Sequence, residues 1–335
     1  MFSTRFLGLG GYLPQRRVTN EELAPKLGVT PDWIVSRCGV EARHFCEPHQ
    51  ATSDLGLEAA KQALDDAKVK PDELDLIIFA TLSPDHEFPG SGFFLQHKLK
   101  TKKYVPVFDL RAQCSGFVYG LSIADKFIRC GEHSKVLLIG AEVHSKGLEF
   151  TEAAKNITVL FGDGGGAMVL GRGEPSEPRF IRATELHADG KFARALWIPG
   201  PGSGTGRPER LDSETISRNE HHAEMDGPQV FLSATHKMPE VVSSLLAREG
   251  MTVADVDLFV VHQANLRILE RVAEKLEVPM ERFHNTIAQT ANTTAASIPL
   301  GLMDARRAGK LKPGTRVMCA TFGAGFTWSA ALLQF

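Results

Sequence analysis

The segment VPVFDLRAQCSGFVYGLSIADKFI, residues 105–128, carries the pattern that decides the fold prediction. Its apolar run 105–109 predicts a short buried strand, and residues 116–128 place apolar side chains at helical spacing. Cys114 lies between the two, in a turn of small residues immediately before the helix. A strand that passes through such a turn into a helix is the repeating unit of an α/β protein.

The rest of the chain continues this alternation. Apolar runs predict further strands at residues 74–80, 136–139, 167–170, 258–261 and 317–321. Helical spacing of apolar residues predicts helices at 53–67, 230–247, 266–276 and 295–308, the first of them capped by Ser53. Because the strands are apolar on both faces, the sequence predicts an α/β fold whose sheets are covered by helices on both sides.

A weak internal duplication divides the chain into two halves, residues 1–172 and 173–335. In the second half, Ala291-Asn292-Thr293-Thr294-Ala295 occupies the place that Ala112-Gln113-Cys114-Ser115-Gly116 has in the first, between a buried strand and a helix. Two such halves would set their helix N-termini facing each other, near a pseudo-twofold axis. The alternative is that any two α/β units look alike at this level. The stretch 185–227, broken by Gly and Pro, predicts a surface insertion or lid.

Composition narrows the functional classes. A net charge of −2 over 335 residues gives no general affinity for nucleic acid or an anionic membrane. No stretch approaches the roughly 20 consecutive apolar residues of a membrane span. The five cysteines are odd in number and lack metal-ligand spacing, which favours reduced thiols in a cytoplasm and argues against a metal site.

Three residues are candidates for chemistry, and each also has a structural interpretation. Cys114 precedes a helix whose N-terminal amides and dipole favour a thiolate, but a buried structural cysteine fits equally well. His262 follows the strand 258–261 at the edge where α/β folds place ligands, although a strand-end histidine with a structural role fits as well. Asn292 is either a helix N-cap or an amide donor to an oxyanion.

Two glycine-rich segments have different interpretations. Gly162-Asp163-Gly164-Gly165-Gly166 lacks the Lys-Ser/Thr of a phosphate loop and is followed by a strand, so the sequence predicts a tight turn there. Gly323-Ala324-Gly325 follows the last long strand, and the amide of Gly325 is a candidate oxyanion-hole donor.

Taken together in their order, these motifs resemble the ketoacyl-acyl-carrier-protein synthase III family of the thiolase superfamily. The resemblance covers essentially the whole chain and rests on residues 33–37, 109–116, 161–166, 262–267, 292–299 and 322–328. It implies a thiolase-like, five-layer αβαβα fold with two duplicated halves, and a homodimer. Cys114 would take an acyl group from an acyl-CoA. A malonyl thioester, on acyl carrier protein or coenzyme A, would then lose carbon dioxide and attack the acyl-cysteine to give a 3-oxoacyl thioester.

The resemblance also implies roles for individual residues. His262 and Asn292 would donate hydrogen bonds to the enolate, and the amides of Cys114 and Gly325 would form the oxyanion hole. The residues implied to contact coenzyme A or its pantetheine arm are Trp33, Arg37, Lys155, Phe231, Ala264 and Asn265. Arg267 would meet the carrier protein or coenzyme A, and Phe88 would close the acyl pocket of the partner subunit. No permanently bound cofactor is implied, because coenzyme A enters as a thioester substrate.

Three positions depart from the family pattern. Lys155 stands where an arginine is frequent, Leu232 where a basic residue is frequent, and Gln113 precedes the nucleophile where alanine is usual. The segment 109–116, together with Ser83-Pro84-Asp85-His86, is similar to members from secondary metabolism, including alkylquinolone-type enzymes. A second hypothesis is therefore an acyltransferase that moves the acyl group from Cys114 to an oxygen, nitrogen or sulfur acceptor. A cysteine protease and a non-catalytic carrier-binding protein are weaker alternatives.

Overall fold

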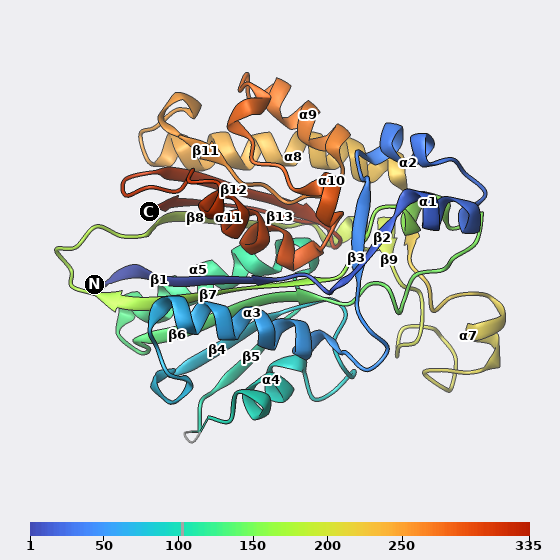
Figure 1. The fold of residues 1–335 in the computed structure, drawn as a ribbon, viewed down its shortest axis with the longest axis horizontal. Coiled ribbons are helices and arrows are strands. Elements are labelled where there is room, and N and C mark those ends of the chain that lie inside the picture. Colours follow the sequence, from blue (N-terminus) through green and yellow to red (C-terminus); the bar gives the residue numbers. More distant parts are fainter. Residues whose placement is uncertain (102–103) are drawn as a thin grey trace.

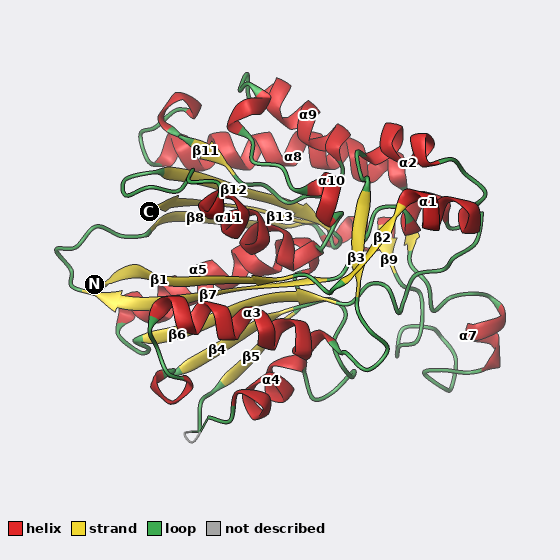
Figure 2. Ribbon diagram, viewed as in Figure 1, coloured by secondary structure: helices red, strands yellow, loops and turns green. Residues whose placement is uncertain are grey.

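The computed structural model describes residues 1–101 and 104–335, and its two main sheets lie one above the other between layers of helices (Figures 1 and 2). Helices α3 (Thr52–Ala67) and α4 (Ser91–Leu99) cover the outer face of the first sheet. Helices α8 (Gly227–Arg248) and α9 (Leu266–Lys275) cover the outer face of the second. Helices α5 (Gly116–Cys130) and α11 (Ser297–Arg307) fill the space between the sheets. The predicted five-layer α/β fold is confirmed.

The first sheet has five strands in the order β1-β7-β6-β4-β5. Strands β4 (Leu76–Ala80), β5 (Val107–Leu110) and β6 (Lys135–Glu142) run parallel, whereas β7 (Gly164–Gly173) and β1 (Ser3–Tyr12) add antiparallel pairs. The carboxyl ends of β4, β5 and β6 therefore meet at one edge, where parallel sheets present their functional loops.

The second sheet repeats this pattern with four strands in the order β11-β12-β13-β8. Strand β11 (Leu258–Phe259) is parallel to β12 (Arg316–Gly323), which pairs antiparallel with β13 (Thr327–Gln334) and through it with β8 (Ile181–Ala188). These strands correspond in pairing to β4, β6, β7 and β1 of the first sheet. The repeat supports the internal duplication inferred from the sequence.

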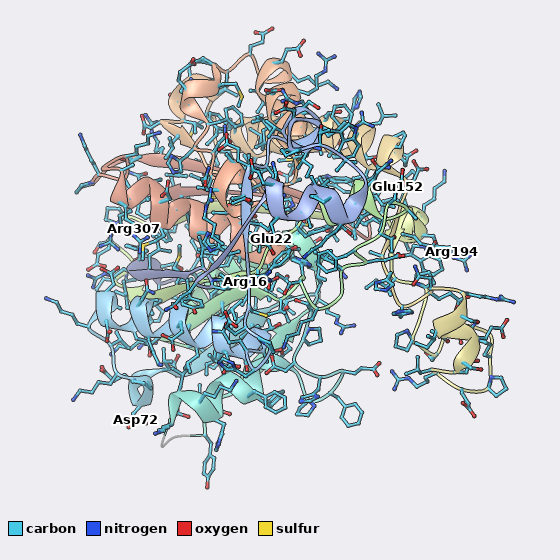
Figure 3. The ribbon with its side chains drawn as sticks, turned by 45° about the vertical axis from the view of Figure 1, so that its right-hand side comes forward. Arg16, Glu22, Asp72, Glu152, Arg194 and Arg307 are labelled. Atoms are coloured by element: carbon cyan, nitrogen blue, oxygen red, sulfur yellow. The ribbon has the colours of Figure 1, made fainter. Side chains whose placement is uncertain are left out.

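Smaller elements form a cap beside the edge where the strands end. A ribbon of β2 (Arg16–Thr19) and β3 (Ala42–Phe45) carries α1 (Asn20–Leu23) and α2 (Pro31–Cys38). Arg16 and Glu22 form an ion pair of 2.5 Å between the ribbon and α1 (Figure 3). The remaining short elements are α6 (Lys155–Thr158), α7 (Ser213–Ser217), α10 (Ile287–Thr290), and the paired strands β9 (Leu196–Trp197) and β10 (Glu224–Met225).

The structure corrects three local predictions: the N-cap of α3, the start of the insertion, and the turn at residues 164–166. Ser53 is not the N-cap of α3, since the helix is capped at Ala51 and the Ser53 hydroxyl donates to Asp85. The insertion predicted at 185–227 begins too early, because Glu185 to Ala188 belong to β8 and pair with β13. Only the part beyond β8 leaves the sheet, and the pair β9–β10 orders its two ends.

The glycines 164–166 were predicted to form a turn, but they belong to strand β7. A Cβ atom on Gly165 would lie 2.6 Å from the carbonyl oxygen of Leu55 in α3, and one on Gly166 would lie 2.5 Å from Pro299 in α11. These glycines therefore let α3 and α11 approach the two faces of the strand closely. Strands β1, β8 and β13 were not predicted. In the described part of the chain, none of the helices combines the length and apolarity required to span a lipid bilayer.

Candidate active site

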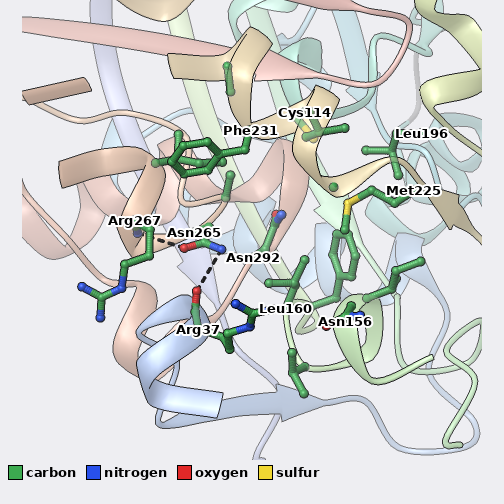
Figure 4. Close-up of a pocket in the computed structure, with 18 of the residues that line it drawn as sticks. Arg37, Cys114, Asn156, Leu160, Leu196, Met225, Phe231, Asn265, Arg267 and Asn292 are labelled. Carbon is green, nitrogen blue, oxygen red and sulfur yellow. Dashed lines mark hydrogen bonds between the residues drawn. The ribbon is translucent and has the colours of Figure 1, made fainter. Parts of the chain in front are cut away.

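A cavity of about 660 Å³ opens between the two halves and is lined by Cys114, His262 and Asn292. Figure 4 shows Cys114 and Asn292 in it. Other lining residues come from α2, α8, the start of α9 and the paired strands β9 and β10: Trp33, Arg37, Leu196, Met225, Phe231, Ala264, Asn265 and Arg267. Its walls are mostly apolar, with a few polar groups at the inner end and at the mouth. This is the usual composition of a pocket for an organic substrate.

Cys114 sits in the 3₁₀ turn 113–115 that leads directly into α5. Gln113 before it has a left-handed backbone, with φ of +43°, which is uncommon for a residue other than glycine. From the other half, the end of β12 lies so near that a Cβ atom on Gly323 would stand 3.0 Å from the Cys114 sulfur. The hydroxyl of Thr321, also on β12, donates to Ser115 at 2.9 Å. The turn that carries Cys114 is thus held between the two halves.

The environment of the Cys114 sulfur differs from the sequence expectation of a thiolate. Burial, and to a smaller extent the negative charge of Glu142, raises the pKa of the thiol to about 12. The backbone N–H groups of Ala324 and of Cys114 itself donate toward the sulfur and lower the pKa, but they do not offset burial. The sulfur therefore carries its proton at neutral pH.

His262 is 1% exposed and continues the parallel pairing beyond β11, with its backbone N–H donating to the carbonyl of Ala320 at 2.9 Å. Its Nδ1 lies 2.8 Å from the hydroxyl oxygen of Ser297. Its Nε2 is buried and has no hydrogen-bond partner within the described chain, which leaves this nitrogen for a bound molecule. Burial, with a smaller contribution from His144, lowers the pKa of His262 to about 3, so the imidazole is neutral.

Asn292 is oriented by its own neighbours. Its Oδ1 accepts the backbone N–H of Thr294 at 2.9 Å, so the NH₂ group is the end of the amide that can face the cavity. Its backbone N–H donates to the carbonyl of Leu160, and its carbonyl accepts the N–H of Gly162. The main chain of Asn292, in the second half, is therefore hydrogen-bonded to the main chain of the first half. An N-cap role does not apply, because α11 begins five residues later.

The mouth of the cavity is built where α2 meets the start of α9. The Arg37 guanidinium lies over the Trp33 ring, 5.6 Å from its centroid. The Asn265 amide donates to the carbonyl of Arg37 at 3.3 Å, and Arg267 Nε donates to the carbonyl of Ser36 at 3.2 Å. Arg267 also holds Glu270 through two short hydrogen bonds. An aromatic face and two guanidinium groups thus stand together at the entrance.

Three predicted site residues do not line this cavity, as expected for Phe88, which was predicted to reach the pocket of a partner subunit. Lys155 forms an ion pair of 3.3 Å with Glu152 and does not line the cavity, whereas its neighbour Asn156 does. Phe88 is 79% exposed on the loop after β4, away from the cavity of its own chain. The amide that faces the Cys114 sulfur from the glycine turn belongs to Ala324, one residue before the predicted Gly325.

Sequence reasoning also missed residues that complete the site. Leu196 and Met225 reach the cavity only because β9 pairs with β10 across a long loop, which no local pattern predicts. Ser297 and Thr294, which hold His262 and Asn292, looked like ordinary small residues of a helix start. His144 was given no role, yet it is buried beside the site and follows the carboxyl end of β6 by two residues. Its position just beyond the end of a parallel strand was the sequence feature that could have identified it.

Comparison with known proteins agrees with this geometry. Residues 108–190 and 246–335 match the family models for 3-oxoacyl-[acyl-carrier-protein] synthase III and for its C-terminal part. Beta-ketoacyl-[acyl-carrier-protein] synthase III of Rhodospirillum rubrum is 42% identical over 338 residues, covering 100% of both chains. The protein of the same name from Methylococcus capsulatus is 40% identical over 99% of both chains.

Among solved structures, 3-oxoacyl-[acyl-carrier-protein] synthase III from Aquifex aeolicus superimposes with a TM-score of 0.89 and 36% identity, covering 99% of this chain and 100% of that one. The thiolase-like fold and the family resemblance predicted from the sequence are thereby confirmed. Full-length identity of this level, together with both family models, shows that the chain belongs to the 3-oxoacyl-[acyl-carrier-protein] synthase III family.

Proposed function

We propose that this protein is a condensing enzyme that joins an acyl group from an acyl-CoA to a malonyl thioester, with loss of carbon dioxide, and releases a 3-oxoacyl thioester. One observation carries the proposal. The sulfur of Cys114, the unpartnered Nε2 of His262 and the amide of Asn292 meet in one mostly apolar cavity, although they come from different halves of the chain. A thiol beside two neutral hydrogen-bonding groups suits acyl transfer followed by enolate stabilisation.

The first step acylates Cys114. The sulfur attacks the thioester carbonyl, the bond to the coenzyme A sulfur breaks, and the thiol proton passes to the departing coenzyme A. The proton can pass through Nε2 of His262 during the attack without a stable imidazolium, because Nδ1 faces Ser297, whose hydroxyl donates to the carbonyl of Thr294 at 2.8 Å. In this arrangement the imidazole proton is on Nδ1 and Nε2 has a free lone pair. The amides of Cys114 and Ala324 would receive the charge that develops on the carbonyl oxygen.

The second step needs hydrogen-bond donors and no general base, because carbon dioxide leaves in place of a proton. When the malonyl carboxylate leaves as carbon dioxide, its bonding electrons form an enolate, which attacks the acyl-cysteine and expels the Cys114 sulfur. The Asn292 NH₂ and an Nε2–H of His262 would stabilise the enolate oxygen. His262 can adopt that tautomer if the Ser297 hydroxyl turns toward Nδ1. The carbonyl of Thr294 still keeps the backbone N–H of Ser297 as a partner.

The mouth of the cavity supports a coenzyme A thioester as the acyl donor. Trp33 offers an aromatic face for a base, and Arg37 beside it offers a cation for phosphate. Asn265 and Ala264 line the path inward, and Phe231 borders it from α8. Arg267 is placed to meet the second substrate, carried by coenzyme A or by acyl carrier protein. Lys155, paired with Glu152 outside the lining, is left out of this proposal.

A homodimer is part of the proposal. Strand β5 is the outer strand of the first sheet, with Phe108 on it 46% exposed, and an open edge of this kind favours pairing with a second copy. Phe88 stands on a loop whose base is fixed by hydrogen bonds from Ser53 and Ser91 to Asp85. A firmly held loop with an exposed aromatic tip suits insertion into the acyl pocket of the partner. The proposed compartment is the cytoplasm, consistent with the free thiol of the exposed Cys130.

The test uses purified protein, acyl-CoA substrates of several chain lengths and intact mass spectrometry. We expect one acyl adduct per chain that disappears in Cys114→Ala, followed by release of carbon dioxide when malonyl-CoA or malonyl acyl carrier protein is added. An adduct that survives Cys114→Ala would refute the nucleophile. Transfer of the acyl group to another acceptor without carbon dioxide release would establish the acyltransferase instead.

A further inference from the structure

We infer that His144 is a positioning residue for the condensation step, acting through Thr294 on both Asn292 and His262. The inference rests on the proposed function. His144 belongs to the first half and Thr294 to the second, and a hydrogen bond of 2.5 Å joins His144 Nε2 to the Thr294 hydroxyl. Both side chains are buried, with exposures of 8% and 1%.

Thr294 is the point where the supports of the two donors meet. Its backbone N–H donates to Oδ1 of Asn292 at 2.9 Å and so turns the amide NH₂ toward the cavity. Its carbonyl accepts the hydroxyl of Ser297, which in turn contacts Nδ1 of His262. The direction of its two peptide groups therefore fixes the orientation of both catalytic side chains.

The backbone of Thr294 is in a conformation that it does not prefer. Its φ of +50° lies in the left-handed region, which is an outlier for a β-branched residue. Such a conformation persists only where surrounding contacts hold it. The backbone N–H and carbonyl of Thr294 are used to support Asn292 and Ser297, and its hydroxyl is hydrogen-bonded to His144. Without that contact the residue can relax, and relaxation would rotate the peptide groups that support Asn292 and His262.

His144 is itself firmly anchored. The buried carboxylate of Asp163 accepts the backbone N–H groups of His144 and Ser145 at 2.7 and 2.9 Å. The imidazole ring packs against Phe161, with centroids 4.6 Å apart, and Phe161 pairs through its backbone with Asn292. The imidazole is neutral, because burial lowers the pKa of His144 to about 4. The contact to Thr294 is therefore a neutral hydrogen bond on a rigid support.

The test separates acylation from carbon dioxide release in four variants: His144→Leu, His144→Gln, Thr294→Val and Thr294→Ser. Removing a single oxyanion donor typically slows a reaction about 100- to 1,000-fold, so we expect a smaller loss of about 10- to 100-fold in carbon dioxide release for His144→Leu and Thr294→Val. Acylation of Cys114 should fall at least several-fold less, because it uses only His262, whereas carbon dioxide release uses both His262 and Asn292. His144→Gln and Thr294→Ser, which keep a hydrogen-bonding group, should restore most of the rate.

The double variant His144→Leu/Thr294→Val gives the decisive comparison. If the two residues act through one contact, its rate and its unfolding free energy should match those of the slower single variant. Independent effects that multiply would overturn the inference, as would equal losses in acylation and carbon dioxide release. The matched controls are His284→Leu and Thr4→Val. His284 is a buried histidine hydrogen-bonded to Asp304. Thr4 is a buried threonine on the outer strand β1 of the first sheet, hydrogen-bonded to Asp125.

Failure of the proposed function would give a different experimental result from failure of this inference. A wild-type protein that forms no acyl adduct and releases no carbon dioxide would remove that function and the catalytic part of this inference. The coupling between His144 and Thr294 would then be decided by the unfolding measurements alone. A wild-type protein that is active while the double variant shows additive effects would overturn only the inference.

Discussion

The substitution Gly140→Ala tests whether the two halves must touch closely for the site to work. Gly140 is on β6, and a Cβ atom there would lie 2.7 Å from the carbonyl carbon of Ala295 and 3.3 Å from the nitrogen of Ala296. The carbonyl oxygen of Ala295 lies nearer still. These are backbone atoms of the turn that contains Thr294, so no side-chain rotation can relieve the overlap.

The size of the effect follows from this geometry. Ordinary van der Waals contact begins near 3.4 Å, so the turn must move by about 1 Å. A displacement of about 1 Å at a catalytic group typically costs about 100-fold in rate. Overpacking of a buried contact costs about 1–3 kcal/mol of unfolding free energy. We therefore expect Gly140→Ala to lose about two orders of magnitude in carbon dioxide release and to unfold at a lower urea concentration.

The assay measures carbon dioxide release from malonyl-CoA after acylation, together with urea unfolding followed by circular dichroism. Gly202→Ala is the matched control, because a Cβ atom at that half-buried position meets no other atom within 4 Å. A Gly140→Ala protein with wild-type rate and wild-type stability would refute the claim that this contact positions the turn.

Three further predictions concern buried polar groups. Asp163→Asn should lower the unfolding free energy by about 3 kcal/mol or more, measured by urea titration, because the carboxylate accepts four hydrogen bonds, from the backbones of Cys46, His144 and Ser145 and the Ser145 hydroxyl. The unfolded protein takes up a proton on His144 near pH 6.5, but the folded protein does so only near pH 4. The unfolding free energy of the wild type should therefore fall relative to His144→Leu as pH drops through this window, by up to about 3 kcal/mol. Because burial raises the Cys114 pKa, its alkylation by iodoacetamide, followed by peptide mass spectrometry, should still accelerate between pH 8 and 10. A plateau below pH 8 would contradict this expectation.

The sequence predicted the parts of the fold that depend on local patterns. Apolar runs located β4, β6 and β12, and helical spacing located α3, α5 and α9 within a few residues. It did not locate β1 and β13, which contain many glycines, alanines and polar residues and become strands through pairing with neighbours. Their identity as strands is set by partners distant in the sequence, and no window of local sequence contains that information.

The same distinction between local patterns and long-range contacts applies to the candidate site. Cys114, His262 and Asn292 could be named as candidates because each follows a recognisable strand or precedes a helix, but only the resemblance to a family favoured a catalytic role for them. Ala324 was missed by one residue, because the direction of an amide depends on the conformation of the turn and not on its glycine content. His144 was missed because its function depends on a single contact with Thr294, 150 residues away in the chain.

The left-handed backbones of Gln113 and Thr294 have a consequence for the stability of this protein. Each is the first residue of the 3₁₀ turn that leads into the central helix of its half, α5 or α11; one turn carries Cys114 and the other follows Asn292. Each costs about 1–3 kcal/mol of folding stability. Glycine at either position would relieve that cost, so the two turns beside Cys114 and Asn292 are places where this chain is less stable than its fold allows.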